Sequence, residues 1–172
     1  MLPMVSGWFG QALCGAGRVS EALQVLTDAV DRQTYKFGGK YTWIHLRLAL
    51  AEACRLDGQL ERAANEAELA RHIAEECGEI VHRSYAILEL GRIALGRCDP
   101  SLALRNAEAA LSEGRPRGLR PFVAECLCVK ARAYGALREA SARAVTMEEA
   151  RRLITQLGLD ERRFPALQIT TA

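Results

Sequence analysis

The residues best suited to chemistry in this chain are a glycine-rich segment, six cysteines and three histidines. Residues 15–20, with the sequence GAGRVS, resemble a phosphate-binding loop. Such a loop needs a β-strand before it, a helix after it and a third glycine. Ser20 replaces that glycine and no β-branched strand precedes the segment, so we interpret it as a turn between two helices. Residues 37–42, FGGKYT, depart from a P-loop in a similar way and are interpreted as a turn between repeats.

The cysteines raise the question of disulfides or a bound metal ion. The N-terminal sequence predicts no secretory signal, so we expect reduced thiols. Cys126 and Cys128 would point about 200° apart on a helix, which makes it difficult for them to share one ion. Cys14, Cys54 and Cys98 fall on or near core positions of the repeats described below, where a free cysteine packs as a small apolar residue. We therefore expect no metal and no cofactor.

The three histidines, His45, His72 and His82, fall in different predicted helices. No serine or cysteine motif predicts a nucleophile beside any of them, and no pair of catalytic carboxylates is indicated. We therefore expect a binding protein and not an enzyme.

Composition narrows the class of protein further. The chain has 172 residues, of which 49% are hydrophobic, enough to bury a sizeable core. Its 23 basic and 21 acidic residues nearly balance, which argues against a surface specialised for nucleic acid. No run of apolar residues is long enough to span a membrane. We expect a cytoplasmic protein with no membrane partner.

An internal repeat of about 40 residues organises the chain. Small residues at positions 10, 51, 91 and 131 recur at steps of 41, 40 and 40, and alanines at 22, 63 and 103 recur at steps of 41 and 40. Two series with one period indicate a helical solenoid. Apolar periodicity and the glycine and proline positions predict helix pairs at 3–16 with 19–35, 41–56 with 60–77, 80–96 with 100–113, and 119–137 with 141–157.

The order and spacing of small and large residues resemble those of the tetratricopeptide repeat (TPR). The matching positions are Gly10, Leu13, Gly17, Ala22, Leu26 and Ala29, then Ala51, Cys54, Gly58, Ala63, Ala67 and Ala70, then Gly91, Ala94, Cys98, Ala103, Ala107 and Ala110. The resemblance implies an all-α, right-handed solenoid of about four stacked antiparallel helix pairs in a single domain, residues 1–172. The repeats would span about 3–37, 41–78, 80–115 and 119–158, followed by a C-terminal tail at 159–172.

A period near 40 exceeds the usual 34 of this family. Such longer repeats are similar to those of bacterial ATPase-type transcription activators and cyclase-associated regulators. This similarity implies a protein- or peptide-binding scaffold within a bacterial signalling or transcription-regulatory protein.

The fourth unit departs from the pattern of the first three. Arg143 stands where the others carry alanine, and Arg138 stands where a turn glycine would be. Thr146 and Glu149 have the spacing of a capping box, which predicts that the last helix begins late, after an irregular turn.

The TPR resemblance also implies a binding groove lined by one row of first-helix residues. That row comprises Gln11, His45, Leu48, Glu52, Arg55, Tyr85, Leu88, Glu89, Arg92, Glu125 and Arg132. Arg92 and Arg132 occupy equivalent positions in neighbouring repeats, about 10 Å apart, from which they could bracket a carboxylate of an acidic partner. In the alternative interpretation, these arginines pair with Glu52, Glu89 or Glu125 as a solvated charge ladder.

Two other surfaces are candidates for contact. The first helix is uncharged and carries Met4, Val5, Trp8 and Phe9, unlike the polar terminal repeat that usually ends a solenoid. This predicts contact with further repeats of a parent chain, with another protein, or with a second copy in a homodimer. The turn from Arg115 to Arg120 is basic and is the basis of a second hypothesis, a nucleic-acid-binding helical repeat.

Overall fold

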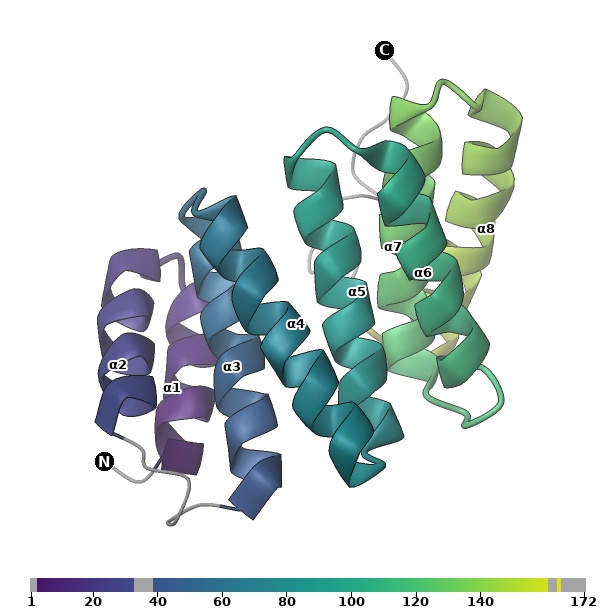
Figure 1. The fold of residues 1–172 in the computed structure, drawn as a ribbon. Coiled ribbons are helices and arrows are strands. Elements are labelled where there is room, and N and C mark those ends of the chain that lie inside the picture. The colour runs from purple at the N-terminus through teal and green to yellow at the C-terminus, as the bar shows by residue number, and fades with distance from the viewer. Residues whose placement is uncertain (1–2, 33–38, 161–163, 165–172) are drawn as a thin grey trace.

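The computed structural model describes residues 3–32, 39–160 and 164, which form eight α-helices and no strand (Figure 1). The helices are α1 (Pro3–Gly15), α2 (Val19–Arg32), α3 (Gly39–Leu56), α4 (Leu60–Cys77), α5 (Ile80–Gly96), α6 (Pro100–Gly114), α7 (Arg120–Ala136) and α8 (Ala140–Gln156). Short turns join them into four pairs that follow one another in chain order. The prediction of an all-α, solenoid-like stack is confirmed. None of the described helices combines the length and apolar character that crossing a membrane requires.

The observed helix bounds agree closely with those predicted. The end predicted for the second helix, at residue 35, lies outside the described residues, as do residues 37 and 38 of the predicted turn. The prediction of a turn is wrong for residues 39–42, which form the start of α3. The predicted tail also lies outside them, except for residues 159, 160 and 164. Of these, Leu159 and Phe164 pack against the core formed by α6, α7 and α8.

The first helix of each pair is the more deeply buried one. α3 packs against α1, α2, α4 and α5, and its residues Ile44, Leu46 and Ala51 are fully buried. Among the described helices, α2 packs mainly against α1 and α3, and of its residues Ala22 and Leu26 are buried. The first helices α1, α3, α5 and α7 also contact one another in series, whereas no two second helices pack comparably within the described chain. The first helices therefore line the inner side of the stack.

Small residues allow the helices of each pair to approach closely. Ala22, Ala63 and Ala103 are all fully buried where the two helices meet. In the fourth pair, Arg143 takes the place of this alanine, and Gly135 lies opposite it on α7. A Cβ atom at Gly135 would be 3.4 Å from Cδ of Arg143. The small residue has thus moved to the facing helix, which keeps the two helices close despite the arginine.

A left-handed residue ends the turn within each pair, at the repeat period. These residues are Gly17, Gly58, Cys98 and Arg138, with φ values of 75°, 83°, 59° and 62°. Arg138 therefore does occupy the turn position that glycine fills in the first two repeats. The prediction that Cys98 lies on or near the core is wrong, because a residue at this turn points into solvent and Cys98 is exposed.

The prediction of a late start for the last helix is also wrong. α8 begins at Ala140, so Thr146 lies in its middle, and the Thr146 hydroxyl donates a hydrogen bond to the carbonyl of Ala142. The alanines before Thr146 are strong helix formers and extend the helix towards its N-terminus. Glu149 forms an ion pair with Arg115 instead of a capping box.

Gly10 provides a test of the close approach between α1 and α2. A Cβ atom there would lie 2.5 to 2.7 Å from three side-chain atoms of the buried Leu26. We expect Gly10→Ala to lower the free energy of unfolding by about 1–3 kcal/mol, measured by urea denaturation followed by circular dichroism. Gly15→Ala is the control, because nothing lies within 4 Å of its added Cβ, and we expect a change below about 0.5 kcal/mol. Equal effects of the two substitutions would contradict this packing.

Candidate functional site

A hollow of about 300 Å³ opens on the inner side of the stack, between α1, α3 and α5. We call it the first-helix pocket. It is lined by Trp8 and Gln11 of α1, by Tyr41, His45, Leu48 and Glu52 of α3, and by His82, Tyr85, Glu89 and Arg92 of α5. Within each helix these residues are three or four positions apart, so they share one helix face. Because the repeat is about 40 residues long, this face of α3 meets the equivalent face of α5.

Aromatic rings form much of the pocket wall. The Trp8 ring packs against His45 at a tilt of 40° with 4.5 Å between ring centroids, and Tyr41 meets His82 edge-on, also at 4.5 Å. Tyr85 packs against Phe122 of α7, with 4.6 Å between ring centroids. Trp8 is 58% exposed, so one wall of the pocket remains open to a ligand.

A network of ion pairs joins α3, α5 and α7 beside the pocket. Arg55 Nε lies 2.5 Å from Glu89 Oε1, and Arg92 Nη1 lies 3.0 Å from Glu89 Oε2. The other terminal nitrogen of Arg92, Nη2, lies 2.5 Å from Glu125 Oε2. The Glu89 side chain is only 5% exposed. A solvated ladder of ion pairs was one of two interpretations of the sequence. The ion pairs are present, but at Glu89 they are buried and not solvated.

The arginines keep Glu89 ionised despite its burial. Burial raises the pKa of this carboxyl, but Arg92 and Arg55 outweigh it and hold the pKa below its ordinary value. Conversely, burial lowers the pKa of Arg92, but Glu89 and Glu125 outweigh it and raise that pKa above its ordinary value. Glu89 and Arg92 are therefore both charged near neutral pH.

Glu52 differs from the other carboxylates of the site. It lines the pocket and is half-buried, yet no hydrogen bond or ion pair engages it within the described part of the chain. Burial, together with the nearby Glu89, raises the pKa of Glu52, and Arg92 and Arg55 offset this only in part. Glu52 is thus an ionisable group held in the pocket at some cost to stability.

His45 is also left unsatisfied. It is only 8% exposed, and its Nε2 atom has no hydrogen-bond partner among residues 3–32 and 39–160. Burial, and secondarily His82, lower the pKa of His45, so the imidazole is neutral near neutral pH. A buried polar atom without a partner is costly in a folded protein unless a ligand or water satisfies it.

The structure brings together most of the predicted row. Of the predicted residues, His45, Glu52, Tyr85, Glu89 and Arg92 line the pocket, together with Gln11 and Leu48, while Arg55 and Glu125 adjoin it through the ion-pair network. The placement of Leu88 in the groove is wrong, because its side chain is fully buried in the core with α7. The next residue, Glu89, lines the pocket instead. Arg132 is exposed and does not line the pocket. The bracketing of a carboxylate by Arg92 and Arg132 stays a prediction, and Arg92 already holds two carboxylates.

Three lining residues were missing from the predicted row. Tyr41 lies four positions before His45, and His82 lies three positions before Tyr85, so each continues a stripe already identified. Trp8 was predicted only as a self-association residue, although it lies three positions before Gln11 of the predicted row. Extending each stripe by one helical turn towards the N-terminus would have found all three.

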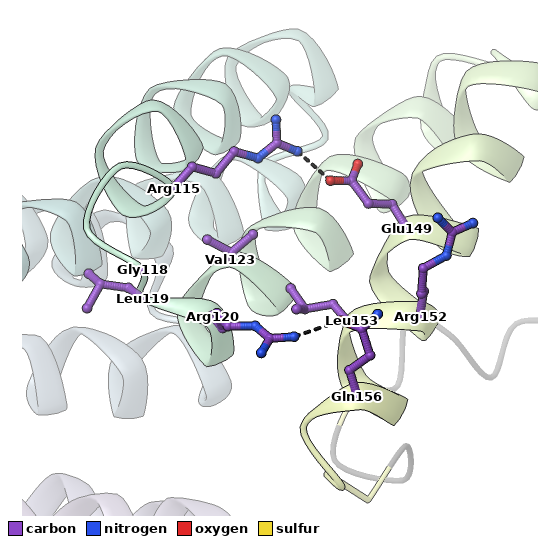
Figure 2. A pocket seen from close by; sticks show the side chains of 9 residues that line it. All are labelled: Arg115, Gly118, Leu119, Arg120, Val123, Glu149, Arg152, Leu153 and Gln156. Atoms are coloured by element: carbon purple, nitrogen blue, oxygen red, sulfur yellow. Dashed lines mark hydrogen bonds and ion pairs between the residues drawn. The ribbon is translucent and has the colours of Figure 1, made fainter.

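A second hollow, of about 260 Å³, lies between the α6–α7 turn, α7 and α8 (Figure 2). Of the arginines predicted to bind nucleic acid, Arg115 and Arg120 line this hollow, and Arg115, Arg117 and Arg120 are all hydrogen-bonded within the chain. Arg115 Nη2 lies 2.6 Å from Glu149 Oε1, Arg120 Nη2 lies 2.7 Å from Gln156 Oε1, and Arg117 donates to the carbonyl of Glu113. Figure 2 shows Arg115 and Arg120 reaching from one side of the hollow to α8 on the other.

The apolar surface predicted on the first helix is present. Met4, Val5, Trp8 and Phe9 are each between 43% and 58% exposed. Whether this surface meets a second copy or another chain stays a prediction.

Burial suppresses the reactivity of the two cysteines of α7. Burial raises the pKa of both Cys126 and Cys128 to about 12, so neither thiol ionises readily. No group of three or more His, Cys, Asp or Glu side chains in the described residues is arranged to hold a metal ion.

No protein-family model matches this chain, and no curated protein is significantly similar to it in sequence. The helical repeat is therefore established by the structure and not by relatives.

The two carboxylates on neighbouring helices should respond oppositely to removal of their charge. We expect Glu89→Gln to lower the free energy of unfolding at pH 7 by about 2 kcal/mol, because it leaves Arg55 and Arg92 partly unpaired. Glu52→Gln should leave stability unchanged or raise it, because burial already disfavours that charge. Urea denaturation of both variants tests this, and a loss of stability in Glu52→Gln would show that this carboxylate supports the fold.

The contribution of Glu89 should also depend on pH. Its pKa in the folded chain lies below the ordinary value of 4.5, so its stabilising effect is complete above that pH and is lost as pH falls through the folded pKa. The stability difference between the native chain and Glu89→Gln should therefore shrink on acidification. Because the pKa of Glu52 is raised, the native chain should gain relative to Glu52→Gln over the same fall in pH. Denaturation curves between pH 7 and pH 3 measure both differences.

Proposed function

We propose that this chain is a binding scaffold that recognises a segment of a partner protein, or a peptide, in the first-helix pocket. The observation that carries the proposal is the meeting of Trp8, His45, Glu52 and Tyr85 from three successive first helices in one hollow. Solenoids use this inner surface for recognition, since stacking places equivalent side chains in a row. Hollows that combine aromatic walls with a few polar groups are typical ligand sites.

The kind of protein to which these repeats belong is proposed on a different basis. The resemblance of the repeats to those of bacterial transcription activators and cyclase-associated regulators supports a place in a signalling or regulatory protein. Such an argument is one of analogy, because a fold does not determine a function. The nucleic-acid hypothesis is the weaker one, because the arginines of the α6–α7 turn are bonded within the chain.

A pocket-blocking substitution tests the proposal. Gln11 lies on the pocket wall contributed by α1, and Gln24 is exposed on α2, outside the pocket. A library of random peptides displayed on phage is selected against the native chain, and the affinities of the recovered peptides are then measured for Gln11→Trp and Gln24→Trp. We expect Gln11→Trp to weaken binding at least about tenfold, because a single blocked anchor site costs this much. Gln24→Trp should bind as the native chain does.

The result is interpreted only for folded variants, shown by equal helical circular dichroism. Failure to enrich any peptide over an empty support, or equal affinity of native and Gln11→Trp chains for every peptide recovered, would overturn the proposed site.

A further inference from the structure

The charges around the first-helix pocket do not cancel. Arg55 and Arg92 balance Glu89 and Glu125, to which they are bonded. Glu52 adds one further negative charge, with no bonded partner in the described chain. When Glu52 is ionised, the pocket therefore has one carboxylate that is available to a ligand.

The walls around this carboxylate suit a positive charge. Trp8, Tyr41 and Tyr85 present aromatic rings, whose faces attract a cation within about 6 Å. The neutral imidazole of His45 does not repel a cation.

An acidic ligand fits the same pocket poorly. It would meet the unpaired Glu52, and it would have to compete with Glu89 and Glu125 for the guanidinium of Arg92. Like charges brought together without compensation disfavour a complex strongly.

The size of the pocket limits what enters it. A volume of about 300 Å³ is at the lower end for ligand sites. It suits a single side chain of a bound segment better than a whole helix.

We infer that the first-helix pocket binds a cationic side chain of the partner segment, arginine or lysine, with Glu52 as its counter-ion and the Trp8 ring as its exposed wall. This inference rests on the proposed function and specifies the chemistry of its ligand. Glu52 is then a binding residue, kept in the pocket although the fold does not need its charge.

Four short peptides test the inference on the full chain. They are acetyl-Gly-Gly-Xaa-Gly-Gly-amide with Xaa as arginine, lysine, citrulline or glutamate, and binding is followed by amide shifts in ¹H–¹⁵N NMR spectra. Citrulline has nearly the shape of arginine without its charge. We expect the arginine or the lysine peptide, or both, to bind at least about tenfold more tightly than the citrulline peptide, with the largest shifts around the pocket. The comparison of arginine with lysine identifies the preferred source of the charge.

Substitutions in the pocket provide the matched comparison. Glu52→Gln should weaken binding of the cationic peptide at least about tenfold, and Trp8→Leu about threefold or more. Glu148→Gln is the control, because Glu148 is exposed on α8, away from the pocket, and its substitution changes the net charge equally. Each variant is first shown to unfold at the same urea concentration as the native chain or a higher one.

In every displayed peptide that the chain selects, each arginine or lysine is also replaced by a neutral residue of similar shape. This second comparison tests the inference even if the pentapeptides bind too weakly to be measured. Equal affinity before and after this exchange overturns the cation inference, while loss of binding to Gln11→Trp still supports the proposed site. Tighter binding of the glutamate peptide overturns the inference in favour of an acidic ligand. Absence of binding by all pentapeptides and all displayed peptides overturns both.

Discussion

The structure depends on the close approach of helices at small buried residues, repeated about every 40 positions. Ala22, Ala63 and Ala103 are fully buried at these contacts, and larger side chains would separate the two helices of each pair. The contact fixes how each helix is rotated about its own axis. The same rotation in every repeat turns equivalent residues towards one surface, which is why His45 and Tyr85, 40 positions apart, line the same pocket. Each first helix packs against its second helix on one face and lines the pocket on another, so this packing decides which residues line the pocket.

Most of this fold could be predicted from the sequence, because the same helix-pair pattern occurs several times and each occurrence supports the others. The bounds of α5 were predicted to the residue, and the row of first-helix side chains was largely identified. The errors arose where one repeat departs from the others. Cys98 resembles a core residue by type but holds the left-handed turn, and Thr146 resembles a helix cap but lies within a helix. In both cases the backbone position decided the environment, and residue type alone did not reveal it.

The partners within the charge network could not be predicted in the same way. Sequence placed Glu52, Glu89 and Glu125 near Arg92 but could not show which of them the arginine would hold, because side-chain length allows all three. The structure divides them into two roles. Glu89 is held by two guanidinium groups and supports the stack, whereas Glu52 is left without a bonded partner in the described chain. Groups that a fold tolerates at some cost to its stability are common where a protein binds its ligand.

The contact between the Trp8 and His45 rings has a consequence for the stability of the array of repeats. In a linear array of repeats, each unit is stabilised mainly by its neighbours. Trp8 belongs to the first described repeat and His45 to the second, so the pocket wall crosses the boundary between two neighbouring repeats. A ligand that holds both rings would strengthen this nearest-neighbour coupling and protect α1 and α2 from local opening. Occupancy of the pocket would then slow amide hydrogen exchange in α1 and α2.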